Sequence, residues 1–238
     1  MIDVALTAAG VRPAAVAVVI DVLRATTTIT QALAGGYERV LCTTTRDQAL
    51  ELRASGRVIA GEKDCVPPAG FDLGNSPSAV ETATGRELVL STSNGTPAIV
   101  ASAGLAEVTL LGCLANLDAL VELLRARGEA DDVLLVCSGT NGRLAVEDVY
   151  VAGRIVVRLG GARSDAAEVC ALVAAAAPEA HKILRESTNG QLLVEVGLED
   201  DIAWCAREST LALVPRVSSV TGEIAVIAAT ELAGLLGE

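Results

Sequence analysis

The sequence predicts an α/β fold, with a three-layer α/β/α arrangement around a largely parallel or mixed sheet. Of its 238 residues 51% are hydrophobic but only 2% are aromatic, so the core must consist of Ala, Val, Leu and Ile. Such residues suit a sheet that helices cover on both faces. Short β-branched runs also alternate with helical stretches over the first 160 residues, as in a sheet with crossover helices. We expect one domain over residues 1–238, which could divide into two lobes.

Six apolar runs bounded by polar or turn residues predict strands that are buried on both faces. These runs cover residues 15–20, 39–43, 58–61, 87–91, 107–111 and 132–137. Helices are expected between them, at about residues 24–34, 46–55, 76–83, 95–103, 115–127 and 144–159. The segment 163–207 has a helical pattern without strong strands. Two late strands are expected at 210–215 and 223–227, paired across a turn at 218–222.

Charge and hydropathy exclude several classes of protein. The net charge is −12, and such a chain repels polyanions, so we expect no nucleic-acid partner. The apolar runs 14–20 and 171–177 are only seven residues long, whereas a membrane-spanning helix needs about 20 residues. No basic stretch precedes an apolar run at the N-terminus, and no cysteine pair has zinc-clamp or redox spacing. We therefore expect a cytoplasmic protein with six free thiols and no membrane segment.

Missing motifs narrow the chemistry further. His181 is the single histidine, which excludes a phosphatase mechanism that needs two histidines. Neither lysine follows a glycine, so a Walker A loop is absent. No Gly-x-Gly-x-x-Gly motif opens a helix, which argues against a dinucleotide-binding fold.

Polar clusters lie where the expected strands lead into helices. In an open α/β sheet this carboxyl edge binds ligands, and helix N-termini there attract anions. In the first cluster, Asp21 ends a strand, and Arg24 with three threonines opens a helix. Asp21 could bind Mg²⁺, and Arg24 could hold a phosphate through two parallel hydrogen bonds. Alternatively, Asp21 is a helix cap that pairs with Arg24.

Two further clusters follow later strands. The first has Glu62 directly after a strand, before a long irregular loop that contains residues 70–77. Long loops in compact domains often carry function, although Phe71 could simply pack this one. The other, residues 91–96, offers hydroxyls, an amide and a glycine turn, which can form a phosphate or oxyanion cradle. The same hydroxyls could also be ordinary helix caps.

The fourth cluster runs from Cys137 to Arg143 and continues to Glu147. Its Cys-x5-Arg spacing is that of cysteine-dependent phosphatases, in which a thiolate attacks phosphorus. Because the chain has six Cys and 16 Arg, such a pair also arises by chance. Arg143 and Glu147 are four residues apart on an expected helix, so a surface ion pair is the alternative.

Read together, these segments resemble the 2-phosphosulfolactate phosphatase (ComB-like) family over about residues 20–150. The resemblance rests on Asp21-Val-Leu-Arg-Ala-Thr-Thr-Thr, Gly61-Glu, Gly70-Phe-Asp-Leu-Gly-Asn-Ser-Pro, Ser93-Asn-Gly-Thr and Ser138-Gly-Thr-Asn-Gly-Arg with Glu147-Asp148. It implies a Mg²⁺-dependent phosphomonoester hydrolase with an α/β/α fold, which releases sulfolactate from 2-phosphosulfolactate in coenzyme M biosynthesis. The substrate would be a small anionic phosphoester.

The resemblance also implies roles for individual residues. The catalytic groups would be Asp21, Arg24 and Arg143. The candidate metal ligands are Asp21, Glu62, Asp72, Glu147 and Asp148. The groups expected to contact the substrate are Thr26, Thr27, Asn75, Ser93, Asn94, Gly95, Thr96, Ser138, Gly139 and Thr140. Attack by metal-activated water would be stabilised by arginine and by loop amides.

Two other hypotheses remain open at this point. The chain could be a cysteine-dependent phosphatase that uses Cys137, or a non-catalytic module that binds phosphate or another anion. Its Ala-rich helices could pack in a homodimer as well as in a single core.

Overall fold

The computed structural model describes residues 1–128 and 132–230. Within them, nine strands form one sheet in the spatial order β1-β7-β2-β6-β8-β9-β3-β5-β4. Along the chain they are β1 (Ile2–Ala5), β2 (Ala14–Ile20), β3 (Arg39–Thr43), β4 (Arg57–Gly61), β5 (Glu87–Ser91), β6 (Ala106–Gly112), β7 (Val133–Cys137), β8 (Val214–Thr221) and β9 (Ile224–Thr230). The strands pair in parallel except where β8 or β9 takes part, which confirms the predicted α/β class.

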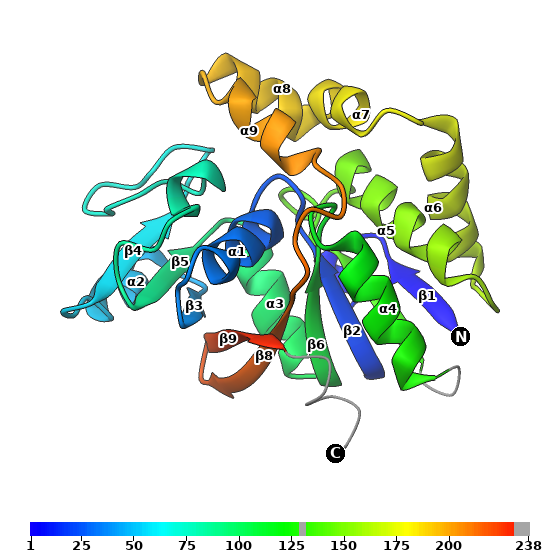
Figure 1. The fold of residues 1–238 in the computed structure, drawn as a ribbon, viewed down its shortest axis with the longest axis horizontal. Coiled ribbons are helices and arrows are strands. Elements are labelled where there is room, and N and C mark those ends of the chain that lie inside the picture. The colour runs from blue at the N-terminus through cyan, green and yellow to red at the C-terminus, as the bar shows by residue number, and fades with distance from the viewer. Residues whose placement is uncertain (129–131, 231–238) are drawn as a thin grey trace.

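Nine α-helices are present in the described residues (Figure 1). They are α1 (Ala25–Ala34), α2 (Arg46–Glu51), α3 (Gly95–Ala103), α4 (Leu117–Arg127), α5 (Val146–Leu159), α6 (Asp165–Ala176), α7 (Ala180–Glu186), α8 (Thr188–Glu195) and α9 (Glu199–Cys205), with short 3-10 turns η1 (Ala8–Gly10) and η2 (Ser78–Val80). The helical pattern expected over 163–207 is confirmed by α6 to α9. In Figure 1 the helices α7, α8 and α9 lie above the sheet rather than flat against it.

The central strand β2 carries apolar side chains to both faces of the sheet. Val18 and Ile20 are fully buried in a cluster with residues of α4, α5 and α6. Ala17 and Val19 point the other way, into a second cluster that contains Ile29 of α1 and residues of α3. Because successive side chains of a strand alternate between faces, a strand covered on both sides must be an unbroken apolar run.

The β8–β9 hairpin divides the sheet into two parallel parts, β1-β7-β2-β6 and β3-β5-β4. Strand β8 pairs antiparallel with β6 at Leu110 and Arg216, and β9 pairs antiparallel with residues 40–43 of β3. Because three antiparallel pairings separate β6 from β3, the strands of one part run in the opposite direction to those of the other. Loops at the carboxyl ends of both parts nevertheless reach one shared cavity.

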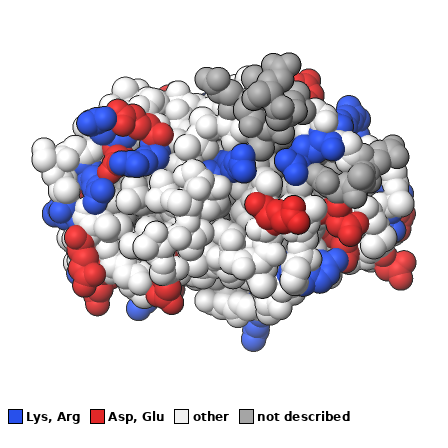
Figure 2. All heavy atoms as spheres, turned by 90° about the horizontal axis from the view of Figure 1, so that it is seen from below, with Lys and Arg blue, Asp and Glu red and all other residues white. Residues whose placement is uncertain are grey.

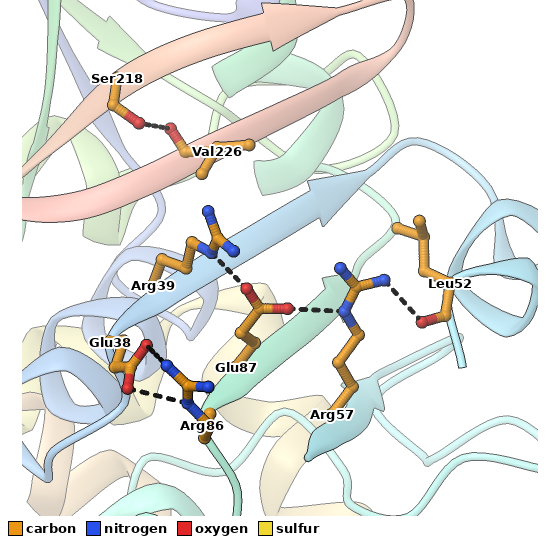
Figure 3. A network of polar contacts seen from close by, with 8 residues as sticks. All are labelled: Glu38, Arg39, Leu52, Arg57, Arg86, Glu87, Ser218 and Val226. Carbon is orange, nitrogen blue, oxygen red and sulfur yellow. Dashed lines mark hydrogen bonds and ion pairs between the residues drawn. The ribbon is translucent and has the colours of Figure 1, made fainter. Parts of the chain in front are cut away.

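Glu87, the first residue of β5, ties together three neighbouring strands (Figure 3). Its direct cross-strand partners are Arg39 on β3 and Arg57 on β4, and both guanidiniums donate to its carboxylate. Hydrogen bonds from Arg57 and Arg39 hold the pKa of Glu87 below its usual range. The more exposed pair of Glu38 and Arg86 lies beside this network. Opposite charges placed across neighbouring strands stabilise the register.

The structure differs from the expected local structure in four places. Strand β1 was not predicted, because its four residues are interrupted by Asp3. Strand β8 begins at Val214 and continues to Thr221, past the expected range 210–215. The sequence pattern missed its second half because that half is largely polar and exposed. The hairpin turn therefore follows Thr221 instead of spanning 218–222. The helix expected at 76–83 is only the short turn η2, since two threonines and Gly85 follow it and disfavour a helix.

The surface carries charges of both signs. Figure 2 shows the face seen from below Figure 1, where acidic and basic side chains are interspersed around a broad area of uncharged residues. All six cysteines are free thiols, as expected. Among the described residues, no helix combines the length and the apolar character that crossing a membrane requires.

Candidate active site

Loops that follow four strands meet at a cavity of about 60 Å³. They follow β2 and β7 in one part of the sheet and β4 and β5 in the other, and α8 contributes from a further side. The lining residues are Asp21, Leu23, Arg24, Glu62, Asp64, Cys65, Asn75, Thr92, Ser93, Asn94, Thr140, Asn141, Asn189 and Leu192. Since one water molecule needs roughly 10–15 Å³ of such space, the cavity favours a small ligand.

Asp21 directly follows β2, and its carboxylate lies at the start of α1. Its Oδ1 accepts a hydrogen bond from the backbone N–H of Ala25 at 3.1 Å, as a helix cap would. The Thr26 hydroxyl donates to the backbone carbonyl of Asp21 and fixes this turn. A Cβ built on Gly95 would come within 2.5 Å of Oδ2 of Asp21. Glycine at position 95 therefore leaves the room that this carboxylate occupies.

Arg24 is buried at 3% exposure, and two partners hold its guanidinium. Its Nη1 lies 2.6 Å from Oδ2 of Asp201 on α9, and its Nη2 donates to the backbone carbonyl of Cys65 at 2.9 Å. The Ser76 hydroxyl donates to the other oxygen of Asp201. Arg24 thus pairs with a residue 177 positions away, and the alternative pairing with Asp21 is not observed.

Glu62 joins the loops after β4 and β5. Its Oε1 accepts from the backbone N–H of Ser93 at 2.7 Å, and its Oε2 accepts from that of Cys65 at 3.0 Å. In the same way, Oδ1 of Asn94 accepts from the backbone N–H of Asn141 at 3.0 Å, which connects the loops after β5 and β7. Side-chain oxygens therefore hold loops from both parts of the sheet together around the cavity.

Glu147 lies in the first turn of α5, fully buried and behind the cavity lining. The side-chain amide of Asn189 on α8 donates to Oε1 of Glu147 at 2.6 Å and to the hydroxyl of Thr140 at 2.6 Å. The helix α8 itself begins at a Ser187 cap, whose hydroxyl accepts from the N–H of Gly190 at 3.0 Å. The cap fixes where α8 starts and so brings Asn189 to the cavity.

Burial raises the pKa values of three neighbouring carboxyls, and repulsion between them adds to the rise in two. Burial raises the pKa of Asp21 to about 7, and the charges of Glu62 and Glu147 add to the rise. Burial also raises the pKa of Glu147. In Asp148, which accepts backbone N–H groups from the loops after β2 and β7, burial and then the charge of Asp21 raise the pKa. The site therefore holds more acidic groups than its own arginine offsets.

The donor set fits Mg²⁺ in its chemistry, because it consists of carboxylate oxygens. Magnesium is commonly bound by one or two carboxylates together with substrate oxygens and water. Asp21 and Glu62 line the cavity and can supply two such carboxylates. In residues 1–128 and 132–230, no three His, Cys, Asp or Glu side chains stand close enough to form a complete metal site. The arrangement suits an ion shared with a substrate better than a closed structural site.

The structure brings part of the predicted set to the cavity. The predicted residues that line it are Asp21, Arg24, Glu62, Asn75, Ser93, Asn94 and Thr140. Oδ1 of Asn75 is buried and has no hydrogen-bond partner among the described residues, so this amide is available to a ligand.

Several other predicted residues support the site without lining it. The hydroxyls of Thr26, Thr27 and Thr96 donate to nearby backbone carbonyls. Gly95 packs against Asp21, and the backbone N–H of Gly139 donates to Asp148. The Ser138 hydroxyl is buried without a partner among the described residues and lies outside the lining.

Asp72 and Arg143 lie outside the cavity lining. The half-exposed carboxylate of Asp72 is held by Arg53 at 3.0 Å and by the N–H of Ile59 at 2.8 Å. Arg143 is exposed and forms no ion pair with any residue in the described part of the chain. The alternative surface pair with Glu147 is therefore not seen, because that carboxylate is buried and bound by Asn189.

Sequence reasoning missed several lining residues. Asn141 belongs to the loop that was singled out and could have been included with its neighbours. Asn189 could not, and neither could Asp201, which holds Arg24 from outside the lining, because their signals are those of ordinary helix caps and surface acids. Asp64 and Cys65 follow Glu62 in a loop with no motif of their own.

Cys137 is the last residue of β7 and is completely buried. Burial, with the nearby charges of Asp148 and Glu147, raises the pKa of its thiol well above the usual range. A nucleophilic cysteine requires the opposite, a lowered pKa and access to substrate. The Cys-x5-Arg spacing is therefore not matched by the environment that a cysteine-dependent phosphatase needs.

Comparison with known proteins relates most of the chain to one family. The family model for 2-phosphosulpholactate phosphatase matches residues 4–219. A probable 2-phosphosulfolactate phosphatase of Thermotoga maritima is 38% identical over 221 residues, which cover 90% of this chain and 94% of the relative. A protein of the same name from a Synechococcus species is 40% identical over 213 residues, 84% of this chain and 87% of the relative. The 2-phosphosulfolactate phosphatase of Methanothermobacter thermautotrophicus is 34% identical over 198 residues, 83% and 84% of the two chains. The chain belongs to the 2-phosphosulfolactate phosphatase family.

Proposed function

We propose that this phosphoric monoester hydrolase acts on 2-phosphosulfolactate, releasing sulfolactate and inorganic phosphate, with Mg²⁺ as its cofactor. The observation that carries the proposal is the composition of the cavity. Arg24 lines it beside Asp21 and Glu62, so a group that can bind phosphate lies next to groups that can bind a cation. The names of the relatives support the choice of substrate.

Arg24 is the proposed phosphate-binding group. Its guanidinium has five N–H donors, and the bonds to Asp201 and Cys65 use two of them. The remaining donors are available to phosphate oxygens. Because the chain as a whole carries a charge of −12, a polyanionic substrate needs such a local cation to offset the general repulsion.

Asp21 and Glu62 are the proposed metal ligands. When bound, Mg²⁺ would supply positive charge beside the phosphate and so favour attack by water on phosphorus. The raised pKa of Asp21 supports this assignment, since a cation relieves the repulsion between Asp21, Glu62 and Glu147 that contributes to the rise. Glu62 keeps its position through two backbone N–H groups.

Arg143 and Asn75 are the proposed outer contacts of the substrate. Thr140 and Asn141 line the cavity, and Arg143 follows them on the same loop with an exposed side chain. Its long guanidinium side chain could reach a sulfonate or carboxylate that projects from the cavity. Asn75 offers an amide that is buried and unpartnered at its oxygen among the described residues.

The test is phosphate release from a panel of phosphorylated carboxylic and sulfonic acids, after exhaustive dialysis against EDTA and after readdition of Mg²⁺. We expect 2-phosphosulfolactate to give the highest kcat/KM, no turnover after chelation, and full recovery with Mg²⁺. Full activity after EDTA dialysis would overturn the cofactor assignment. Phosphate binding without turnover of any compound, at any metal concentration, would instead identify a non-catalytic anion-binding module.

A further inference from the structure

We infer that Asp201 is a positioning residue for Arg24, and that the segment from α7 to α9 (residues 180–205) thereby completes the active site. The inference rests on the proposed function, because it takes Arg24 as the phosphate-binding group. None of the motifs by which the sequence resembles the family, which lie within about residues 20–150, includes Asp201.

The geometry of the pair supports this role. The side chains of Arg24 and Asp201 are only 2% and 5% exposed, and Nη1 and Oδ2 are 2.6 Å apart. Both oxygens of Asp201 are used, because the Ser76 hydroxyl donates to Oδ1. Arg24 lines the cavity but Asp201 does not. Asp201 therefore does not touch a phosphate in the cavity, and its contact with the site is the guanidinium that it holds.

The carboxylates around the cavity show what Asp201 prevents. Asp21, Glu62 and Asp64 line the same space as Arg24, and a guanidinium pairs readily with any carboxylate within reach. Without Asp201, only the Cys65 carbonyl would hold Arg24, and the side chain could turn toward Asp21 or Glu62. It would then occupy the proposed metal ligands and point its donors away from the phosphate. The buried pair of Arg24 and Asp201 therefore keeps the guanidinium away from the carboxylates of Asp21 and Glu62.

An orienting role and a purely electrostatic role of Asp201 predict opposite changes in phosphate affinity when its carboxylate is removed, and this difference can be tested. Removing the Asp201 carboxylate leaves one negative charge fewer near an anionic substrate, so a purely electrostatic effect would strengthen phosphate binding. Loss of orientation would weaken it. A residue that serves only to hold the fold together would alter the thermal midpoint and leave phosphate binding unchanged.

The experiment uses the full chain and compares Asp201→Ala and Asp201→Asn with a matched control, Asp200→Asn, which changes an exposed acid on the same helix. We expect Asp201→Ala to lower kcat/KM for 2-phosphosulfolactate by about 10- to 100-fold, as loss of a supporting side chain commonly does. The Kd of inorganic phosphate, measured by calorimetry at fixed Mg²⁺, should rise. Asp201→Asn, which keeps an acceptor oxygen, should lie between wild type and Asp201→Ala, and Asp200→Asn should stay within about twofold of wild type.

A double variant tests whether Asp201 acts on catalysis through Arg24. In an Arg24→Lys background, Asp201→Ala should change kcat/KM by no more than about twofold, because the group it positions is already altered. An undiminished effect there would overturn the inference, as would unchanged or tighter phosphate binding in Asp201→Ala. Should both Asp201 variants fail to fold, Ser76→Ala decides: weaker phosphate binding supports the inference, and an unaltered Kd overturns it.

The phosphate measurement also separates this inference from the proposed function. A wild-type chain that binds phosphate but does not hydrolyse 2-phosphosulfolactate would refute the proposed function, while the Kd series would still decide the role of Asp201. A wild-type chain that binds no phosphate would overturn both.

Discussion

The side-chain amide of Asn189 lies 2.6 Å from Oε1 of Glu147, so a residue of α8 fixes a carboxylate at the start of α5. Asn189 lines the cavity and Glu147 lies behind it. The amide therefore stands between a buried acid and the space where a ligand would bind. A hydrogen bond of this kind sets the direction in which a carboxylate presents its second oxygen.

Replacing Asn189 by alanine should release Glu147 and lower kcat/KM. We expect a loss of about 10- to 100-fold, the usual effect of removing a supporting partner at a metal-dependent site. Gln191→Ala is the matched control, since Gln191 is exposed on the same helix. Steady-state kinetics of the two variants check this, and equal rates would mean that Glu147 needs no such support.

Asp21→Asn should strongly lower activity and stabilise the metal-free protein. Removing a central electrostatic group should cost on the order of 10²-fold in kcat or more. Because the pKa of Asp21 is raised to about 7 in the fold, its contribution to stability is present below its unfolded pKa and is lost as pH rises through about 7. The thermal midpoint of the metal-free wild type should therefore fall from pH 5 to pH 8, in part because Asp21 ionises.

The asparagine variant should lose that part of the decline and melt higher than wild type at pH 8, by about 2–4 °C for each kcal/mol recovered. Asp47→Asn, at an exposed acid on α2, should keep both the activity and the pH dependence of the wild type. An Asp21→Asn protein that melts no higher than wild type at pH 8 would show that the ionised Asp21 carboxylate does not destabilise the fold.

Arg143→Lys should weaken catalysis without affecting stability. Lysine keeps the charge but cannot reproduce the planar two-pronged grip of a guanidinium, so kcat/KM should fall. The thermal midpoint should remain that of the wild type, since the exposed Arg143 has no ion-pair partner among the described residues. Unaltered kinetics would remove Arg143 from the proposed site and leave Arg24 as the phosphate-binding arginine.

Cys137→Ala should retain activity. The thiol is fully buried and its pKa is raised, so it does not form the thiolate that covalent catalysis needs. We expect kcat/KM within about twofold of wild type, together with a lower thermal midpoint from the small cavity left behind. Loss of turnover in a folded Cys137→Ala protein would restore the cysteine-dependent mechanism.

Glu87→Gln should destabilise the fold without affecting the site. It weakens charged hydrogen bonds from Arg39 and Arg57, at an expected cost of roughly 1–3 kcal/mol. Because the folded pKa of Glu87 is lowered, its stabilisation is present above the unfolded pKa and is lost as pH falls through the folded value. Urea unfolding at neutral and acidic pH should show the difference between variant and wild type shrinking in acid. Glu38→Gln removes a pair with Arg86 that is largely exposed to solvent, so it should show a smaller effect of the same sign.

The sequence predicted the features that depend on local pattern. Unbroken apolar runs such as 15–20 predict buried strands, and acids that follow strands predict the ligand edge, so Asp21 and Glu62 could be placed at one site. Features that depend on distant partners could not be found in this way. Asn189 reaches the cavity and Asp201 reaches Arg24 only because the segment 180–205 folds back toward the cavity. No spacing in the sequence encodes these contacts.

Spacing alone could not settle the chemistry of residues whose burial depends on the fold. Cys137 and Arg143 have the separation of a phosphatase loop, yet Cys137 ends a buried strand and Arg143 lies on the surface. The strand β1 was missed for a related reason, since four residues interrupted by an acid carry too little pattern. In each case the outcome depends on the neighbours that the fold supplies.

The position of the β8–β9 hairpin has a consequence for synthesis of the protein on the ribosome. The hairpin follows all the other strands and helices of the described residues along the chain but lies in the middle of the sheet. Until it emerges, β6 and β3 each have one bare edge, and such edges invite pairing with other chains. The nascent polypeptide therefore exposes two sheet edges that can pair with other chains until residues 214–230 have left the ribosome. The loops of the two parts of the sheet can close around one cavity only after the hairpin has joined these parts, so the cavity is completed after residues 214–230 have been synthesised.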